Sequence, residues 1–137
     1  MNIIVGASGQ IGSHLTKRLL LDKGIPAIAV VRNPEKVKDE NFKVRHADLF
    51  NLDQVVNAFK GGTTAFLLTP ENPSSNDIIK DTKNIIENYK KAVEENKIQR
   101  IVILSCIGAH IEGKTGNIIM SQLLEKQFDD FNIEKII

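Results

Sequence analysis

The sequence predicts an α/β fold in which a doubly wound parallel sheet, with strand order 3-2-1-4-5-6, lies between helices in a three-layer α/β/α arrangement. Two observations lead to this prediction. Short apolar runs rich in β-branched residues alternate with longer segments whose apolar residues recur at helical spacing. One run, residues 27–31, is apolar throughout, as expected where helices cover both faces of a sheet. With 137 residues the chain can form one proper core but not two, so a single domain over residues 1–137 is expected.

Each expected strand is a short apolar run, and each expected helix carries apolar residues on one face. The expected strands are residues 2–5, 27–31, 42–46, 65–68, 101–104 and 133–137. The expected helices are residues 11–23, 51–59, 76–96 and 116–131. The apolar positions of the first helix are Ile11, Leu15, Leu19 and Leu20. Gly24 suits the left-handed residue after a helix, and Asn51 suits an N-cap.

Composition excludes several classes of partner. The 18 basic and 17 acidic side chains give a net charge of +1 without a basic block, so no nucleic-acid partner is expected. No apolar run approaches the length of about 20 residues that crosses a bilayer, so no membrane association is expected. The single cysteine, Cys106, cannot form an internal disulfide, and the N-terminus lacks a signal-peptide pattern, so a cytoplasmic protein is expected. No cluster of Cys, His and carboxylate residues has metal-ligand spacing.

Three glycines, Gly6, Gly9 and Gly12, lie between the first expected strand and the first expected helix. Gly6 can form the tight turn, Gly9 lets a pyrophosphate approach the backbone N–H groups, and Gly12 lets helix and strand pack closely. The unpaired donors and the dipole of the helix start then face the anion. The spacing differs from the commoner Gly-x-Gly-x-x-Gly, and the loop lacks the Gly-Lys-Ser/Thr of a Walker loop. The alternative is a tight turn without a ligand, but one glycine suffices for a turn, so the dinucleotide site of a Rossmann fold is predicted.

The residue that ends the second strand indicates which dinucleotide is bound. NAD(H) sites carry an acidic residue there, whereas a 2′-phosphate requires cations. Here the residue is Arg32, which can bind phosphate bidentately; Lys36 can add charge and Ser8 a hydroxyl. NADP(H) is therefore favoured over NAD(H). The alternative is that Arg32 is an ordinary solvated arginine, and the nearby Glu35 weakens the phosphate interpretation.

Two further segments are expected near the cofactor by topology alone. The first is Asp48-Leu49, after the third strand, where a side chain could reach the adenine edge, although Asp48 could equally serve only to shape the loop before the Asn51 helix. The second is Leu68-Thr69-Pro70, at the end of the fourth strand, which would line the cofactor trough.

Four segments together resemble the NmrA-like group of atypical short-chain dehydrogenase/reductases, and the likeness covers essentially the whole chain. They are Gly6-Ala7-Ser8-Gly9-Gln10-Ile11-Gly12, Val30-Val31-Arg32-Asn33-Pro34, Ala47-Asp48-Leu49 and Leu104-Ser105-Cys106-Ile107-Gly108-Ala109. The resemblance implies a Rossmann domain that binds NADP(H), or less often NAD(H), followed by a smaller C-terminal substrate region. Some members of the group reduce quinones or related compounds, and others are redox sensors without turnover.

The resemblance also implies roles for individual residues. The implied cofactor contacts are Gly6, Ser8, Gly9, Gln10, Ile11, Gly12 and Arg32, with Asp48 near the adenine. Ser105 falls where reductases of this superfamily carry their catalytic serine. The Tyr-x-x-x-Lys pair of those enzymes would fall near Asn117 and Ser121, which cannot replace it. His110 is an alternative proton donor on the correct edge of the sheet, whereas Tyr89, the only tyrosine, is expected in the core.

Two functions follow from these observations, and the missing Tyr and Lys pair favours neither. The first is an oxidoreductase that passes hydride from the nicotinamide to a small acceptor such as a quinone, which needs least acid catalysis. The second is an NAD(P)-binding redox sensor or regulator. Sugar-nucleotide chemistry is disfavoured because those enzymes usually retain the pair. The expected partners are the dinucleotide and a small-molecule substrate, and a homo-oligomer remains open.

The chain ends inside an expected strand, at Ile136 and Ile137, without a cap or a polar tail. A truncated polypeptide that lacks the C-terminal substrate region is therefore expected, and the alternative is a natural minimal domain with six strands. Weak cofactor binding and poor turnover are expected of the isolated chain.

Overall fold

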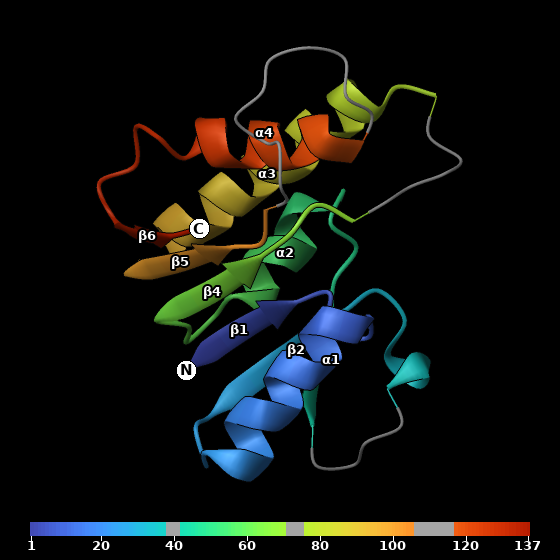
Figure 1. The fold of residues 1–137 in the computed structure, drawn as a ribbon, viewed down its shortest axis with the longest axis vertical. Helices are drawn as coiled ribbons and strands as arrows, with labels where there is room; N and C mark the ends of the chain where they lie inside the picture. The colour runs from blue at the N-terminus through green and yellow to red at the C-terminus, as the bar shows by residue number, and fades with distance from the viewer. Residues whose placement is uncertain (38–41, 71–75, 106–116) are drawn as a thin grey trace.

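The computed structural model describes residues 1–37, 42–70, 76–105 and 117–137, and within them the sheet has six parallel strands (Figure 1). In chain order the strands are β1 (Asn2–Val5), β2 (Ala27–Val31), β3 (Lys43–His46), β4 (Thr64–Leu67), β5 (Arg100–Ile103) and β6 (Glu134–Ile136). Their order across the sheet is β3-β2-β1-β4-β5-β6. The predicted doubly wound α/β fold and its strand order are confirmed.

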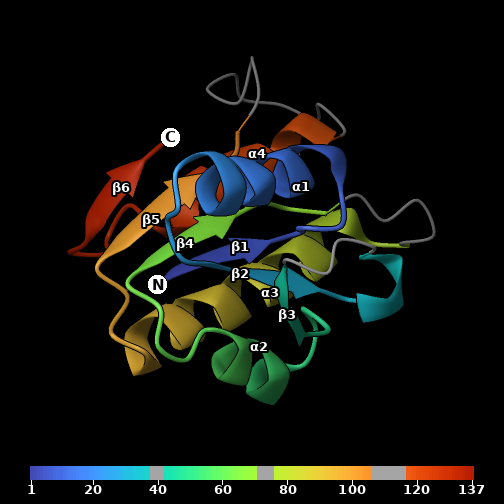
Figure 2. The ribbon, with the colours of Figure 1, turned by 90° about the horizontal axis from the view of Figure 1, so that it is seen from below.

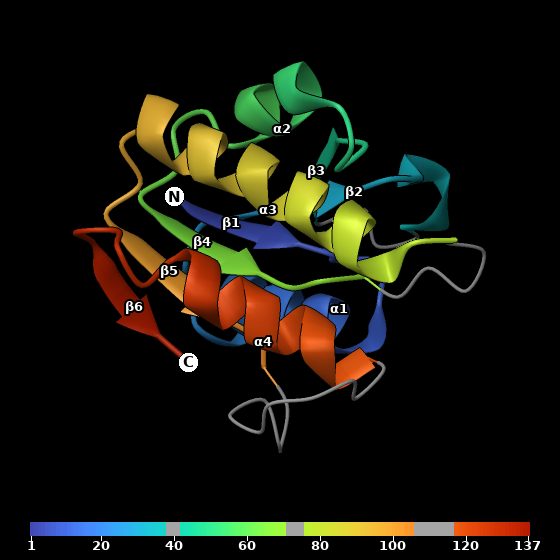
Figure 3. The ribbon, with the colours of Figure 1, turned by 90° about the horizontal axis from the view of Figure 1, so that it is seen from above.

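Helices lie on both faces of this sheet. They are α1 (Gln10–Lys17), which continues as a π-helix (Arg18–Asp22), α2 (Leu52–Ala58), α3 (Ile78–Glu95) and α4 (Asn117–Gln127), with a short 3-10 helix at Pro34–Lys36. Figure 2 shows α1 on one side of the sheet, with α2 and α3 on the other. Figure 3 shows α3 and α4 side by side. The three predicted layers are therefore present.

The strands alternate their side chains between two apolar clusters because successive residues of a strand point to opposite faces. Ile3 and Val5 of β1 lie in the larger cluster, with residues of α2, α3 and α4. Ile4 lies in the smaller cluster, against which Leu15 of α1 packs. All five residues of β2 are buried, which confirms that both faces of this strand are covered.

The first helix differs from its prediction at one position. Ile11 was expected on the apolar face, but its side chain is 54% exposed, whereas Leu15, Leu19 and Leu20 pack on the sheet. The buried face of α1 carries Gly12 and Thr16, which are four residues apart, and Ile11 lies off that face. Gly24 has a φ of +62°, which confirms the left-handed residue expected after this helix.

The boundaries of several elements also shift, those of β4, α4 and β6 among them. β4 begins at Thr64, which pairs with Asn2, and it ends before Leu68, whose carbonyl accepts a hydrogen bond from Tyr89 instead of from a strand. The expected helix over residues 116–131 ends at Gln127, and the expected strand over residues 133–137 pairs only over Glu134–Ile136. Within the described residues, no helix is long and apolar enough to cross a bilayer.

Candidate functional site

A pocket of about 230 Å³ opens at the carboxyl ends of β1, β2, β3 and β4. This edge is where open parallel sheets bind their ligands, at the point where the strand order reverses. Eight residues that the sequence placed at the cofactor line the pocket together: Gly6, Ser8, Arg32, Lys36, Asp48, Leu49, Leu68 and Pro70. The structure therefore brings together residues from four separate loops at the predicted edge.

Gly6 and Gly12 have structural reasons to be glycine. Gly6 has a φ of +71°, and a Cβ there would lie 2.9 Å from Cδ2 of Leu68. A Cβ on Gly12 would lie 2.3 Å from the Gly6 carbonyl oxygen and 2.9 Å from Cα of Ala7. Main-chain atoms cannot give way at such distances, so Gly12 lets α1 pack against the turn, as predicted. The local geometry therefore agrees with the two structural roles expected of these glycines, the tight turn at Gly6 and the close packing at Gly12.

Gly9 is different, because the described chain does not require a glycine there. Its φ of −83° and ψ of 177° suit any residue. A Cβ would meet only the Gly6 carbonyl oxygen, at 3.4 Å, which is an ordinary contact. The side of the loop that a Gly9 side chain would occupy is therefore open, as expected where a ligand approaches the backbone closely.

The start of α1 offers donors without acceptors. Gly9 is its N-cap and makes no side-chain cap hydrogen bond. The backbone N–H of Gly9 donates to the Gly6 carbonyl and that of Ser13 donates to the Gly9 carbonyl, both at 3.0 Å. The N–H groups of Gln10, Ile11 and Gly12 have no acceptor among the described residues. These donors, together with the helix dipole, suit an anion.

Two cations in the pocket wall are unpaired. Arg32 directly follows β2 and Lys36 ends the 3-10 helix; both side chains are exposed. Neither forms a hydrogen bond or ion pair with the described residues, and Glu35 pairs with neither of them. Ser8 is exposed in the facing loop and also lines the pocket. The pocket therefore presents two cations that are unpaired within the described residues, a hydroxyl and the carboxylate of Asp48.

Asp48 shapes its own loop. Its Oδ1 accepts a hydrogen bond from the Phe50 N–H at 2.9 Å, and its own N–H donates to Oε1 of Gln54 at 2.8 Å. Asn51 caps α2, as predicted, by accepting from the Gln54 N–H at 3.1 Å. The loop-shaping interpretation of Asp48 is therefore correct; since Asp48 also lines the pocket, an adenine contact stays a prediction.

Sequence reasoning missed three pocket residues that lie outside the expected segments or roles, which are Asn33, Phe50 and Ile85. Ile85 belongs to α3, so this helix forms part of the pocket wall. The expectation that Tyr89 is a core residue is confirmed, since its side chain is fully buried. Its hydroxyl donates to the Leu68 carbonyl at 2.7 Å, and burial raises the pKa of the Tyr89 phenol. A sequence signal existed, because a buried tyrosine hydroxyl usually needs a partner.

Other predicted residues lie away from the pocket wall. Gly9, Gln10, Ile11 and Gly12 form the loop and first turn beyond it, and Thr69 lies between two wall residues without lining the pocket. Ser105 follows β5, and its Oγ is buried with no hydrogen-bond partner among the described residues. His110 and Cys106 lie outside the described residues.

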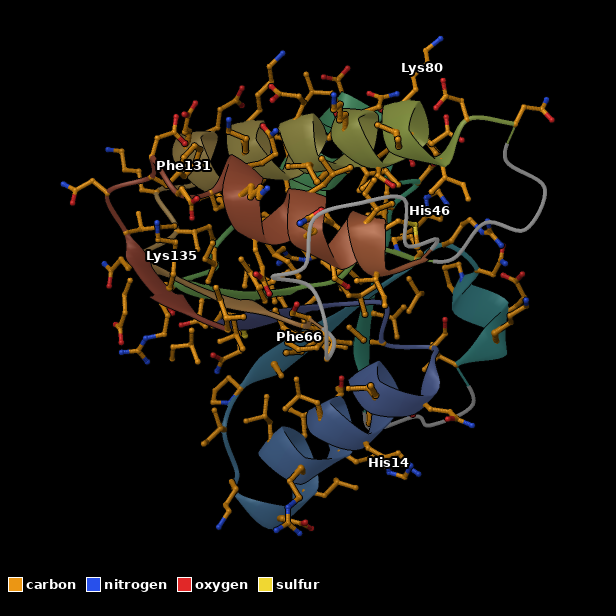
Figure 4. All side chains as sticks on the ribbon, turned by 45° about the horizontal axis from the view of Figure 1, so that its top comes forward. His14, His46, Phe66, Lys80, Phe131 and Lys135 are labelled. Atoms are coloured by element: carbon orange, nitrogen blue, oxygen red, sulfur yellow. The ribbon has the colours of Figure 1, made fainter. Side chains whose placement is uncertain are left out.

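The remaining candidates do not form a catalytic cluster in the described part of the chain. His14 and His46 are exposed, and Figure 4 shows His14 on α1, turned away from the sheet. Ser121 is half-buried on α4, which begins at Asn117, so this helix carries neither member of a Tyr and Lys pair at these positions. The described residues bring together no group of three His, Cys, Asp or Glu side chains that could hold a metal ion.

This chain is similar in sequence and in fold to several known proteins. The sequence profile of the NAD(P)H-binding family matches residues 6–131. The chain is 29% identical over 116 residues to cinnamoyl-CoA reductase 2 of Medicago truncatula, covering 77% of this chain and 34% of that protein. A nucleoside-diphosphate-sugar epimerase from Staphylococcus aureus shares the fold, with a TM-score of 0.83 and 23% identity over 98% of this chain and 48% of the other.

A second solved structure is similar to the same extent. The triphenylmethane reductase of Citrobacter sp., complexed with NADP(H), has a TM-score of 0.79 and 25% identity, covering 98% of this chain and 47% of that one. The present chain thus spans about half the length of these two solved proteins and about a third of the plant reductase.

Proposed function

Since this chain belongs to the family of NAD(P)H-binding proteins, we propose that it binds NADP(H) in preference to NAD(H) at the carboxyl edge of its sheet. One observation carries the proposal: Arg32 and Lys36 line the same pocket as the glycine loop, and neither cation is paired within the described residues. Two cations that have no ion-pair partner among the described residues, in one concave site, favour an anion such as the 2′-phosphate of NADP(H), although the site also holds one carboxylate, that of Asp48.

The pocket suits the adenosine half of the cofactor. Its volume of about 230 Å³ is below the range of roughly 300–1,000 Å³ that whole ligands occupy, so it would take one part of the dinucleotide. Arg32, Lys36 and Ser8 would hold the 2′-phosphate. The apolar side chains of Leu49 and Phe50, beside Asp48, would form the wall next to the adenine.

The pyrophosphate would lie over the loop and the start of α1. There the N–H groups of Gln10, Ile11 and Gly12 point at the anion, and Gly9 leaves the approach open. Leu68 and Thr69 would line the path toward the nicotinamide. The cofactor supplies the hydride, and the protein supplies binding, orientation and electrostatics.

We further propose that the activity is oxidoreduction, with hydride transfer to a small acceptor such as a quinone. A conjugated acceptor can take its proton from solvent, so its reduction needs little acid catalysis by side chains. This suits α4, which carries neither a tyrosine nor a lysine at the positions of the missing pair. Ser105, with its buried and unpaired Oγ, is the candidate contact to the acceptor, and His110 is the candidate proton donor. A sensor without turnover is the second candidate, supported by the same missing pair.

Titration with NADPH and NADH, for the native chain and for Arg32→Ala, tests the cofactor proposal. The native chain is expected to bind NADPH more tightly, and Arg32→Ala is expected to lose most of that preference while its affinity for NADH changes little. Equal affinities of the native chain for the two cofactors would remove the phosphate contact. To separate enzyme from sensor, the chain is incubated with NADPH and a panel of quinones, since a sensor binds NADPH without consuming it.

A further inference from the structure

We propose that Asn88 and Tyr89 of α3 are positioning residues that set the width of the adenosine pocket. The Asn88 side-chain amide donates to the Leu49 carbonyl at 2.8 Å, and the Tyr89 hydroxyl donates to the Leu68 carbonyl at 2.7 Å. Leu49 and Leu68 both line the pocket. Two consecutive residues of one helix thus hold two loops of the pocket wall. This inference rests on the proposed function, because it concerns the binding of the same cofactor.

The sheet alone cannot fix the spacing of these two loops. Leu49 follows β3 and Leu68 follows β4, and in the sheet β2 and β1 lie between those strands. The last backbone hydrogen bonds before each loop are those of Ala47 with Val31 and of Leu104 with Leu67. Beyond these points the two loops share no strand ladder, so α3 supplies a direct connection between them (Figure 3).

The same face of α3 also reaches the pocket. Ile85 lies three and four residues before Asn88 and Tyr89, which places it on the same side of the helix, and its side chain lines the pocket. A shift of α3 would therefore change the pocket wall and both of its anchored loops together.

Asn88 and Tyr89 are both buried, so losing either side-chain hydrogen bond leaves a buried polar group without a partner. Asn88 is 7% exposed and Tyr89 is 0% exposed. The Tyr89 ring is also held independently of its hydroxyl, because it stacks on Phe59 with ring centroids 6.3 Å apart. Tyr89→Phe should therefore keep the packing of the ring and remove only the bond to Leu68.

Asn96, the C-cap of α3, provides a control at the far end of the helix. Its side-chain amide donates to the Val56 carbonyl at 3.0 Å, across 40 residues of sequence, much as Asn88 reaches the Leu49 carbonyl across 39, and it also donates to the Ala92 carbonyl at 2.9 Å. Val56 belongs to α2, and neither Val56 nor Ala92 lines the pocket. Asn96→Leu therefore removes the same kind of long-range bond, together with one bond within α3, at a place where neither bond can set the pocket width.

The test measures the binding of adenosine 2′,5′-bisphosphate, NADPH and nicotinamide mononucleotide to the whole chain, alongside thermal unfolding. Tyr89→Phe and Asn88→Leu are each expected to weaken binding of the bisphosphate and of NADPH by about two- to ten-fold, the net worth of one hydrogen bond. Binding of the mononucleotide should not change. Asn96→Leu should lower the unfolding temperature and leave bisphosphate affinity within about two-fold of the native value.

The outcomes separate the two proposals. If the native chain binds neither the bisphosphate nor NADPH, the proposed function fails and this inference fails with it. If the native chain binds both and all three variants bind equally well, only the positioning role is overturned. The role is also overturned if affinity falls in proportion to the unfolding temperature in all three variants, Asn96→Leu included, since that pattern indicates general loss of stability.

Discussion

The glycine loop allows a direct separation of folding from ligand binding, because two of its glycines differ in what surrounds them. Gly12→Ala would place a Cβ 2.3 Å from the Gly6 carbonyl oxygen and 2.7 Å from its carbon, which are both main-chain atoms. Gly9→Ala would place a Cβ no closer than 3.4 Å to the nearest atom, also the Gly6 carbonyl oxygen. The same chemical change is therefore blocked at one position and accommodated at the other.

The magnitudes follow from these contacts. Overpacking of this kind costs roughly 1–3 kcal/mol, so Gly12→Ala should lower the unfolding temperature by about 4–12 °C for a chain of this size. At Gly9, replacing glycine restricts the unfolded chain and stabilises by about 0.4–1 kcal/mol. Alanine is a poorer N-cap than glycine, at a cost of about 0.5–1 kcal/mol. The two effects at Gly9 nearly cancel, so its stability should stay within about 1 kcal/mol of the native value.

Thermal unfolding and NADPH titration of both variants test this reasoning. Gly9→Ala should unfold near the native temperature and bind NADPH at least about ten-fold more weakly, because its methyl group would enter the space through which a phosphate reaches the N–H groups. Gly12→Ala should unfold at a lower temperature than both the native chain and Gly9→Ala. Native affinity in a well-folded Gly9→Ala variant would refute the placement of the pyrophosphate at this loop. A large loss of stability in that variant would refute the account of the loop itself.

Two further predictions concern stability. The folded-state pKa of the Tyr89 phenol is raised above its unfolded value. The contribution of this phenol to the free energy of unfolding is therefore fully present below about pH 10, and it declines as the pH rises beyond that, by up to about 1.4 kcal/mol per pH unit. Tyr89 is the only tyrosine and the chain has no tryptophan, so alkaline ultraviolet titration reports this residue alone; ionisation at the ordinary pKa in the folded protein would contradict the prediction. Lys135→Met should destabilise the protein by about 1–2 kcal/mol in denaturant unfolding, since Nζ of Lys135 donates to the carbonyls of Phe128 and Asp129 at the end of α4. Lys126→Met, an exposed lysine on the same helix, is the control, and equal effects would exclude the capping role.

Local pattern was enough to predict the architecture. The apolar run at residues 27–31 identified a strand buried on both faces, and the alternation of such runs with helical segments identified a parallel sheet in the observed order. The spacing of Gly6, Gly9 and Gly12 predicted a glycine loop between β1 and α1, which lies at the carboxyl edge of the sheet, and the match over residues 6–131 confirms the predicted family of NAD(P)-binding proteins. These features depend on residues close together in the chain, which is why they can be predicted from it.

The tertiary structure alone decided how the site is assembled. Asn88 and Leu49 are 39 residues apart, so no local pattern indicates that they meet, and the same holds for Ile85 in the pocket wall. Whether Arg32 has a partner depends on the positions of every other charge around it. Ile11 follows the helical pattern yet is exposed, because the face of α1 that became buried carries Gly12 and Thr16 instead. The sequence by itself thus determined which elements form and in what order, since periodicity and turn chemistry act locally. The packing of distant segments decided which side chains face the pocket, because contact and burial exist only once those segments are brought together.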